Sequence, residues 1–97
     1  MKVEYHPAIE GELRGIINYY NSCSHGLGTS FLNEFEQHIL RIASMPTRWV
    51  NVDGDIRRSL MRRFPYVIYY RVLESDVLRV TVVKHQRRRP EYGRSKR

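Results

Sequence analysis

The spacing of the hydrophobic residues changes once along this chain, near Asp53-Gly54-Asp55. Before this turn, apolar residues recur every three or four positions, which is the pattern of helices that bury one face. After it, short apolar runs alternate with turn residues, which is the pattern of β-strands. A small chain can bury both kinds of apolar face only if its helices pack on its sheet. The sequence therefore predicts an α+β fold.

The helical part predicts two antiparallel helices. Pro7 stands at the start of the first helix, where proline is well tolerated, and Pro46 ends the second. Residues 21–26 form the loop between them, and a loop this short makes the helices antiparallel neighbours. Gly11 and Gly15 lie four residues apart on one face, so we expect another element to approach closely there. The two apolar stripes are Ile9, Leu13, Ile16, Ile17 and Tyr20, then Leu27, Phe31, Phe35, Ile39, Ile42 and Ala43.

The second half predicts an antiparallel sheet that the helical hairpin covers on one face. Strands are expected at residues 56–64, 67–73 and 77–84, joined by turns short enough for hairpins. Residues 2–5 are compatible with a further short strand, which gives the order β-α-α-β-β-β. In the last strand, alternation places one set of residues on one face and the other set opposite. These sets are Leu78, Val80 and Val82 against Arg79 and Thr81.

Length and composition predict one small domain, residues 1–97. A chain of 97 residues with 41% hydrophobic residues can build a single core. The first residues do not resemble a signal peptide, and the absence of a long apolar run predicts no membrane association. Cys23 is the only cysteine, so it cannot form an internal disulfide. We therefore expect the protein in a reducing cytoplasm.

The net charge of +7 is concentrated near the C-terminus. Residues 84–97 hold seven Lys or Arg and one acidic residue, Glu91, whereas the rest of the chain is nearly neutral. Such a field attracts polyanions, either nucleic acid or an acidic protein segment. The alternative is a solvated basic tail without a partner, and we expect residues 91–97 to be mobile.

Several kinds of site are absent from the sequence. The four histidines and Cys23 are scattered and show no metal-ligand spacing. There is no Gly-rich phosphate loop and no Ser nucleophile elbow. Asp53 and Asp55 flank a glycine, which is typical of a turn. The sequence therefore predicts neither a metal nor a cofactor.

Two basic and aromatic segments, residues 62–71 and 85–92, are the candidate functional regions. Attack of an RNA 2′-hydroxyl on its phosphate needs a proton acceptor, a proton donor and nearby cations. Arginine stays protonated and supplies only the charge, whereas Tyr92 or His85 could transfer a proton. The candidate residues for binding a target or a phosphate are Arg62, Arg63, Tyr66, His85, Arg87, Arg88 and Arg89.

The same residues also have structural interpretations. Tyr66, Tyr69 and Tyr70 are good strand residues, and at least two of them are expected to pack in the core. The arginines at positions 57, 58, 62 and 63 could be solvated charges that protect a sheet edge from aggregation. His85 could simply form a hydrogen bond to a neighbouring strand or turn.

In their order along the chain, several segments resemble the RelE/ParE superfamily of bacterial type II toxins. The resemblance is greatest to the branch called plasmid-stabilisation proteins, and it covers nearly the whole chain. It implies a small β-α-α-β-β-β toxin that a cognate antitoxin wraps and silences. The segments are Tyr19-Tyr20, Leu27-Gly28 with Phe31 and Phe35, Pro46, Ile56-Arg57-Arg58, residues 63–66 with 68–71, and residues 85–88 with Pro90 and Tyr92.

Two target classes occur in this superfamily. RelE-like members cut messenger RNA on the ribosome without a metal, whereas ParE-like members poison DNA gyrase. In the first case, the resemblance implies that the catalytic residues are Arg58, Arg63, Arg88 and Tyr92. The sequence also departs from the ribonuclease pattern, because basic residues are expected where Leu60, Val67 and Gln86 stand.

We therefore predict a ParE-like toxin that acts by binding, with DNA gyrase as its target and an antitoxin as its partner. Contact with DNA would come through the toxin–antitoxin complex. The alternatives are a ribosome-dependent mRNA interferase, an inactive toxin-fold module that binds an antitoxin or acts as a co-repressor, and a plain nucleic-acid-binding domain.

Overall fold

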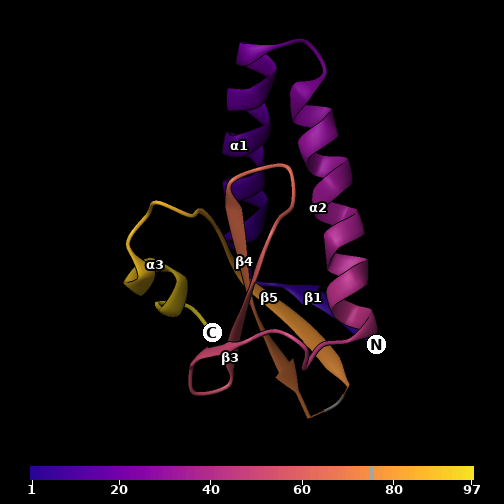
Figure 1. The fold of residues 1–97 in the computed structure, drawn as a ribbon, viewed down its shortest axis with the longest axis vertical. Coiled ribbons are helices and arrows are strands. Elements are labelled where there is room, and N and C mark those ends of the chain that lie inside the picture. The colour runs from indigo at the N-terminus through magenta and orange to yellow at the C-terminus, as the bar shows by residue number, and fades with distance from the viewer. Residues whose placement is uncertain (75) are drawn as a thin grey trace.

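The computed structural model describes residues 1–74 and 76–97 (Figure 1). The two longer helices form an antiparallel hairpin that packs on a sheet, which confirms the predicted α+β fold. In the described ranges, no helix is long and apolar enough to cross a membrane. The elements are β1 (Lys2–Tyr5), α1 (Ile9–Cys23), α2 (Leu27–Ser44), β2 (Asn51–Asp53), β3 (Ile56–Leu60), β4 (Tyr66–Leu73), β5 (Val77–His85) and α3 (Pro90–Arg94).

The turn between α1 and α2 brings the two helices into close contact. Gly26 has a φ of 78°, in the left-handed region that glycine adopts without strain. The side-chain oxygen of Asn21 accepts a hydrogen bond from the backbone N–H of Gly28 at 2.8 Å. A Cβ at Gly28 would overlap the backbone of α1, so the close approach occurs here. The expectation for Gly11 and Gly15 is wrong, because nothing lies within 4 Å of a Cβ at either position.

The strands form one sheet in the order β1-β5-β4-β3-β2. β1 pairs with β5 in parallel, and the other neighbouring strands are antiparallel. The sequence did not predict β2, and β3 ends at Leu60 rather than at Phe64. The reason is a contact from the helices: a carboxylate oxygen of Glu34 accepts hydrogen bonds from the backbone N–H groups of Arg62 and Arg63 at 3.1 and 2.9 Å. These two donors bind α2 and cannot extend the strand.

The main core lies between the helical hairpin and one face of the sheet. Tyr70 is fully buried there, and its hydroxyl donates to the carbonyl oxygen of Pro46 at 2.7 Å. Tyr69 is also buried but belongs to a second cluster on the opposite face, because successive residues of a strand point to opposite sides. The prediction that at least two of the strand tyrosines pack in the core is confirmed. The main core includes Phe31, Phe35, Ile39, Ile42, Ile68, Leu78 and Val80.

A bulge in β5 changes which residues face the helices. Tyr70 pairs with Val80 but Tyr69 pairs with Val82, so Thr81 is an extra residue without a partner on β4. One inserted residue reverses the facing of every side chain that follows. The prediction that Val80 and Val82 share a face is therefore wrong: Val80 packs in the main core, and Val82 packs on the opposite face.

We call this opposite side the open face; it carries Ile56, Val67, Tyr69 and Val82, and α3 packs on part of it. Gly93 of α3 lies directly against the ring of Tyr69, so that a Cβ at this position would overlap the ring atoms. Beyond α3, the ammonium group of Lys96 contacts Glu12 of α1 at 2.9 Å. Residues 91–97, expected from the sequence to be a mobile tail, thus have specific partners, which favours a docked segment.

Candidate functional site

A basic hollow lies on the open face, across β3, β4 and β5. Its volume is about 600 Å³, which is in the range of ligand-binding pockets. Strand pairing places Leu60, Val67 and Lys84 in one row across the sheet, and Arg58 opposite Tyr69 in the next. Among the residues that the structure describes, no carboxylate lines the hollow. The lining residues are Arg58, Leu60, Val67, Tyr69, Lys84, Gln86, Arg87 and Pro90.

Lys84 is the buried cation of the basic hollow. Only 3% of the residue is exposed, and its ammonium group donates to the carbonyl oxygen of Arg88 at 3.0 Å. The same group lies 5.6 Å from the centre of the Tyr69 ring. Burial lowers the pKa of Lys84, and the positive charges of Arg58 and Arg88 lower it further. The site therefore holds an amine whose charge is disfavoured by its own surroundings.

Three consecutive arginines follow β5 and form an exposed rim. We call Arg87, Arg88 and Arg89 the arginine rim. Arg87 also lines the basic hollow, and the guanidinium carbon of Arg88 lies 4.1 Å from the centre of the Tyr92 ring, in a cation–π contact. In the described part of the chain, none of the three forms an ion pair with a carboxylate. Their charge is thus presented to solvent, where it can attract a polyanion.

Tyr92 is engaged by α1. Its hydroxyl donates to one carboxylate oxygen of Glu12 at 3.0 Å, and this oxygen also accepts from Lys96. The other oxygen of Glu12 accepts from the backbone N–H of Val83 at 3.0 Å. That N–H is free of a strand partner because β1 pairs with β5 only as far as Val80. Glu12 therefore joins α1, β5 and the C-terminal segment through one carboxylate.

Arg62 and Arg63 lie in a different hollow, beside α2. The side chain of Arg63 donates to Glu34 at 2.9 Å, in addition to the two backbone hydrogen bonds at this loop. Although burial alone would raise the pKa of Glu34, the hydrogen bonds from Arg63 hold it below its usual value. Nearby, a ring nitrogen of His38 and the hydroxyl of Ser59 lie 2.7 Å apart and are both buried. This hollow is a structural junction between α2 and β3.

Tyr66 and His85 pack together on the helical side of the sheet. Their ring centres are 5.3 Å apart in an edge-to-face arrangement, and Tyr66 also contacts the main core. Burial raises the pKa of Tyr66. His85 accepts a hydrogen bond from the backbone N–H of Arg87 at 3.1 Å, which shapes the turn that leaves β5. These two residues support the site and do not line the basic hollow.

The predicted ribonuclease residues do not meet at one point. Arg88 and Tyr92 are in contact, whereas Arg58 lines the basic hollow and Arg63 lines the hollow beside α2. The structure instead adds Lys84 and Glu12, which the sequence did not single out. A lysine inside a buried strand was the available signal for Lys84. The bulge that turns it to the open face is not visible in the sequence pattern.

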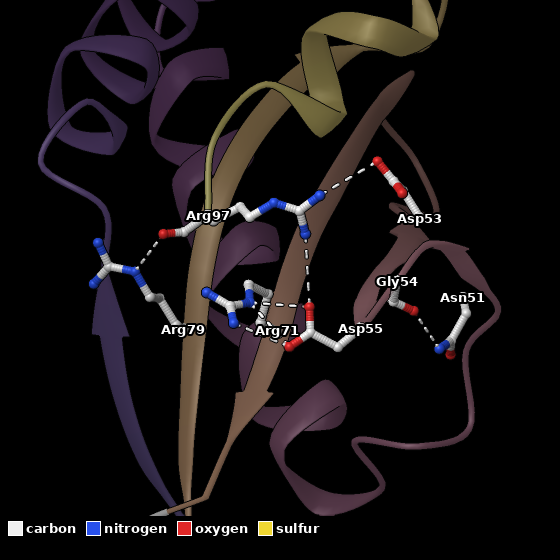
Figure 2. Close-up of polar contacts among 7 residues, drawn as sticks. All are labelled: Asn51, Asp53, Gly54, Asp55, Arg71, Arg79 and Arg97. Atoms are coloured by element: carbon white, nitrogen blue, oxygen red, sulfur yellow. Dashed lines mark hydrogen bonds and ion pairs between the residues drawn. The ribbon is translucent and has the colours of Figure 1, made fainter.

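The other basic residues of the C-terminal segment are neutralised by contacts. Figure 2 shows Arg97 lying across the face of the sheet. Its guanidinium group is 3.5 Å from Asp53 and 3.8 Å from Asp55, and its main-chain oxygen accepts a hydrogen bond from Arg79. Asp55 also accepts hydrogen bonds from Arg71, and these bonds lower the pKa of Asp55. The unpaired positive charge is therefore concentrated at the basic hollow and the arginine rim.

The arrangement can bind an anion, and the two candidates for proton transfer, Tyr92 and His85, are not among the described residues that line the basic hollow. Burial raises the pKa of Tyr70 to about 12, so this phenol keeps its proton. Tyr92 is directed to Glu12. Across residues 1–74 and 76–97, no group of three His, Cys, Asp or Glu side chains could hold a metal ion. Cationic recognition is the chemistry that the geometry supports.

Comparison with solved structures identifies toxins of the same fold. A chain from the chromosomal ParDE TA system from P. aeruginosa matches with a TM-score of 0.75 at 9% identity, over 88% of this chain and 95% of that chain. The isolated E. coli RelE toxin matches with a TM-score of 0.66 at 15% identity, over 97% of this chain and 93% of that chain.

Sequence comparison gives the family directly. No curated protein matches the sequence significantly. Residues 3–90, however, match the profile of the family described as ParE toxin of type II toxin-antitoxin system, parDE. The match covers most of the chain and includes the sheet that carries the basic hollow. The chain therefore belongs to the ParE toxin family of type II toxin–antitoxin systems.

Proposed function

We propose that this protein is a growth-arresting toxin that binds DNA gyrase and that a cognate antitoxin neutralises it in the cytoplasm. Membership of the ParE family supports the toxin role. Gyrase is the target that the resemblance to ParE-like toxins implies. The observation that favours binding over RNA cleavage is the hydrogen bond between Tyr92 and Glu12.

Cleavage of RNA by this fold would require several groups to act together. A proton acceptor, a proton donor and cations must face the same phosphate. The Tyr92 hydroxyl lies 3.0 Å from Glu12, and the side chain of Arg63 is bound to Glu34. Both residues would have to leave their present partners before they could serve one phosphate. A toxin that acts by binding needs no such rearrangement.

We place the target contact on the arginine rim and the adjacent Arg58. These arginines are exposed and have no carboxylate partner in the described ranges, so their charge is available to an acidic surface. Complementary charges accelerate encounter and fix the orientation of the partners. Arg62 and Arg63 contribute less in this proposal, because Glu34 already holds their loop.

The antitoxin is expected to cover the same region. Leu60 is 54% exposed beside the basic hollow, so an apolar side chain and several cations lie together on one surface. An acidic, amphipathic segment would bury the leucine and neutralise the arginines at once. Contact of the complex with DNA would then come through the antitoxin.

The direct test compares gyrase inhibition with RNA cleavage by the purified chain. We expect loss of DNA supercoiling by gyrase and gyrase-dependent DNA breaks, with intact translation in a cell-free system. Replacing Arg87, Arg88 and Arg89 together by Gln should weaken inhibition by about tenfold or more, since steering depends on local charge. The charge-matched control replaces Arg14, Arg41 and Arg48 by Gln and should retain inhibition.

Other outcomes would identify the alternatives. Codon-specific RNA ends together with unaffected gyrase would contradict the proposal and indicate an mRNA interferase. Normal growth of cells that express the folded chain without an antitoxin would indicate a toxin-fold module that only binds its partner. Equal loss of inhibition in both triple variants would move the target contact away from the arginine rim.

A further inference from the structure

One member of the arginine rim is held by both its side chain and its backbone. The guanidinium carbon of Arg88 lies 4.1 Å from the centre of the Tyr92 ring. The carbonyl oxygen of Arg88 accepts a hydrogen bond from the ammonium group of Lys84 at 3.0 Å. Among the residues that the structure describes, no ion pair or cation–π contact holds the side chain of Arg87 or Arg89. Arg88 is therefore the ordered arginine of the rim.

The Tyr92 ring that contacts Arg88 is in turn fixed by Glu12 of α1. The carboxylate of Glu12 accepts hydrogen bonds from the Tyr92 hydroxyl at 3.0 Å, from the backbone N–H of Val83 at 3.0 Å and from Lys96 at 2.9 Å. Only 13% of the Glu12 side chain is exposed. A hydrogen bond to an ionised group that is shielded from water is stronger than one at the open surface. The position of the ring thus depends on Glu12.

We propose that Glu12 is a positioning residue that, through Tyr92, holds the guanidinium group of Arg88 ready for the target of the toxin. This inference rests on the proposed function and deepens it, because it assigns a role to a residue of α1. An arginine side chain has many rotamers, and ordering it at an interface reduces affinity. The contact with Tyr92 orders Arg88 before the target binds. A guanidinium group stacked on a ring still presents its N–H edge to a carboxylate.

Charge and position have opposite consequences for a change at Glu12. Glu12→Gln removes a negative charge, which by itself would favour binding to an acidic surface. The same change weakens the contact with Tyr92, because a phenol donates a stronger hydrogen bond to a carboxylate than to a neutral amide. If Glu12 acts by positioning Arg88, the variant binds its target more weakly although its net positive charge is higher.

The affinity of purified variants for gyrase measures this effect. We expect Glu12→Gln and Tyr92→Phe each to weaken binding by about threefold to tenfold, the range expected for ordering one arginine side chain. In a chain that also carries Arg88→Gln, either change should alter affinity by less than about twofold, because the positioned group is absent. Glu10→Gln is the matched control: it makes the same charge change on the same helix, at a side chain that is 82% exposed, and should not weaken binding.

Nuclear magnetic resonance tests the positioning without any target. Protons above the face of an aromatic ring are shifted upfield, so the side-chain signals of Arg88 should show this shift in the wild-type chain. Glu12→Gln and Tyr92→Phe should reduce it, and Tyr92→Phe keeps the ring and provides the test alone if the other variant fails to fold. If the wild-type chain does not bind gyrase, the proposed function fails, whereas a reduced upfield shift still supports the role of Glu12.

Three results would overturn the positioning role. The first is an Arg88 upfield shift that is the same in the wild type and in both variants. The second is an equal loss of affinity from Glu12→Gln with and without Arg88, which would show that Glu12 acts only on the stability of the fold. The third is tighter binding by Glu12→Gln, which would show that its charge alone matters.

Discussion

A methyl group added at Gly93 would test how firmly α3 holds the C-terminal segment against the sheet. The Cβ of Gly93→Ala would overlap the ring of Tyr69. This ring cannot easily move, because Tyr69 is 2% exposed and packs with Ile56, Val67 and Val82. The clash is therefore relieved by displacement of α3. We expect residues 90–97 to loosen while the main core remains folded.

The size of the effect follows from what α3 contributes. Overpacking a tight contact costs about 1–3 kcal/mol. Displacement of α3 also breaks the hydrogen bonds from Tyr92 and Lys96 to Glu12 of α1, whose side chain is only 13% exposed. We therefore expect a loss of about 1–3 kcal/mol in the free energy of unfolding. In a domain of this size, each kcal/mol lowers the Tm by about 4–8 °C.

Urea unfolding and amide hydrogen exchange measure the two parts of this prediction. The midpoint of unfolding should fall, and the amides of residues 92–97 and of Val83 should exchange faster. Gly15→Ala is the matched control, because nothing lies within 4 Å of its Cβ. That substitution should stabilise α1 by about 0.5–1 kcal/mol, since alanine favours helix more than glycine does.

An unchanged midpoint for Gly93→Ala, with unchanged exchange of the C-terminal amides, would refute the docking of α3 on Tyr69. Rapid exchange of these amides already in the wild-type protein would support the mobile tail expected from the sequence. Loss of stability in both glycine variants would show that the glycines matter for a reason other than the contact with Tyr69.

The other predictions concern contacts that hold the fold together. Burial lowers the pKa of His38 from 6.5, so the unfolded chain binds more protons than the folded chain below that pH. The free energy of unfolding should therefore fall as the pH drops below about 6.5. Urea unfolding of His38→Gln at several pH values should no longer show this pH dependence. The lowered pKa of Glu34 implies a further loss of stability below about pH 4.5 in wild-type protein, absent from Glu34→Gln. Gly28→Ala should cost about 1–3 kcal/mol, because its Cβ would overlap the backbone of α1; a thermal melt equal to wild type would contradict this packing. Asp55→Asn should lower the free energy of unfolding by at most about 1 kcal/mol, because its lost partners Arg71 and Arg97 are at the surface. The loss should be smaller at high salt. A loss that does not depend on salt would exclude an electrostatic cause.

Local pattern was sufficient for the helices and for most of the strands. The stripes from Ile9 and from Leu27 repeat with the helical period. The loop predicted at residues 21–26 is shorter in the structure, because α1 continues to Cys23. β4 and β5 were predicted within one residue of their observed ends, because their side chains and turns are typical of strands. β2 was missed, since a strand of three residues carries almost no periodic signal.

The candidate site could be predicted only in part. The arginine rim is evident from composition, because three adjacent arginines follow a strand. Lys84 was not singled out, because uninterrupted alternation would have placed it on the same face as Val80, inside the core. The bulge at Thr81 instead places Lys84 on the open face, and this bulge forms only because of the way β5 pairs with β4. Sequence spacing alone does not determine such a register shift.

The sequence by itself determined the α+β class, the helical hairpin and the surplus of positive charge, since these depend on neighbours within a few residues. Only the tertiary structure decided which charges remain available. Glu34 binds Arg63, which lies 29 residues away, and Glu12 binds Lys96, which lies 84 residues away. An ion pair between distant positions forms only when packing brings both groups together. That packing left Lys84 in the basic hollow, where no carboxylate of the described ranges lies beside it.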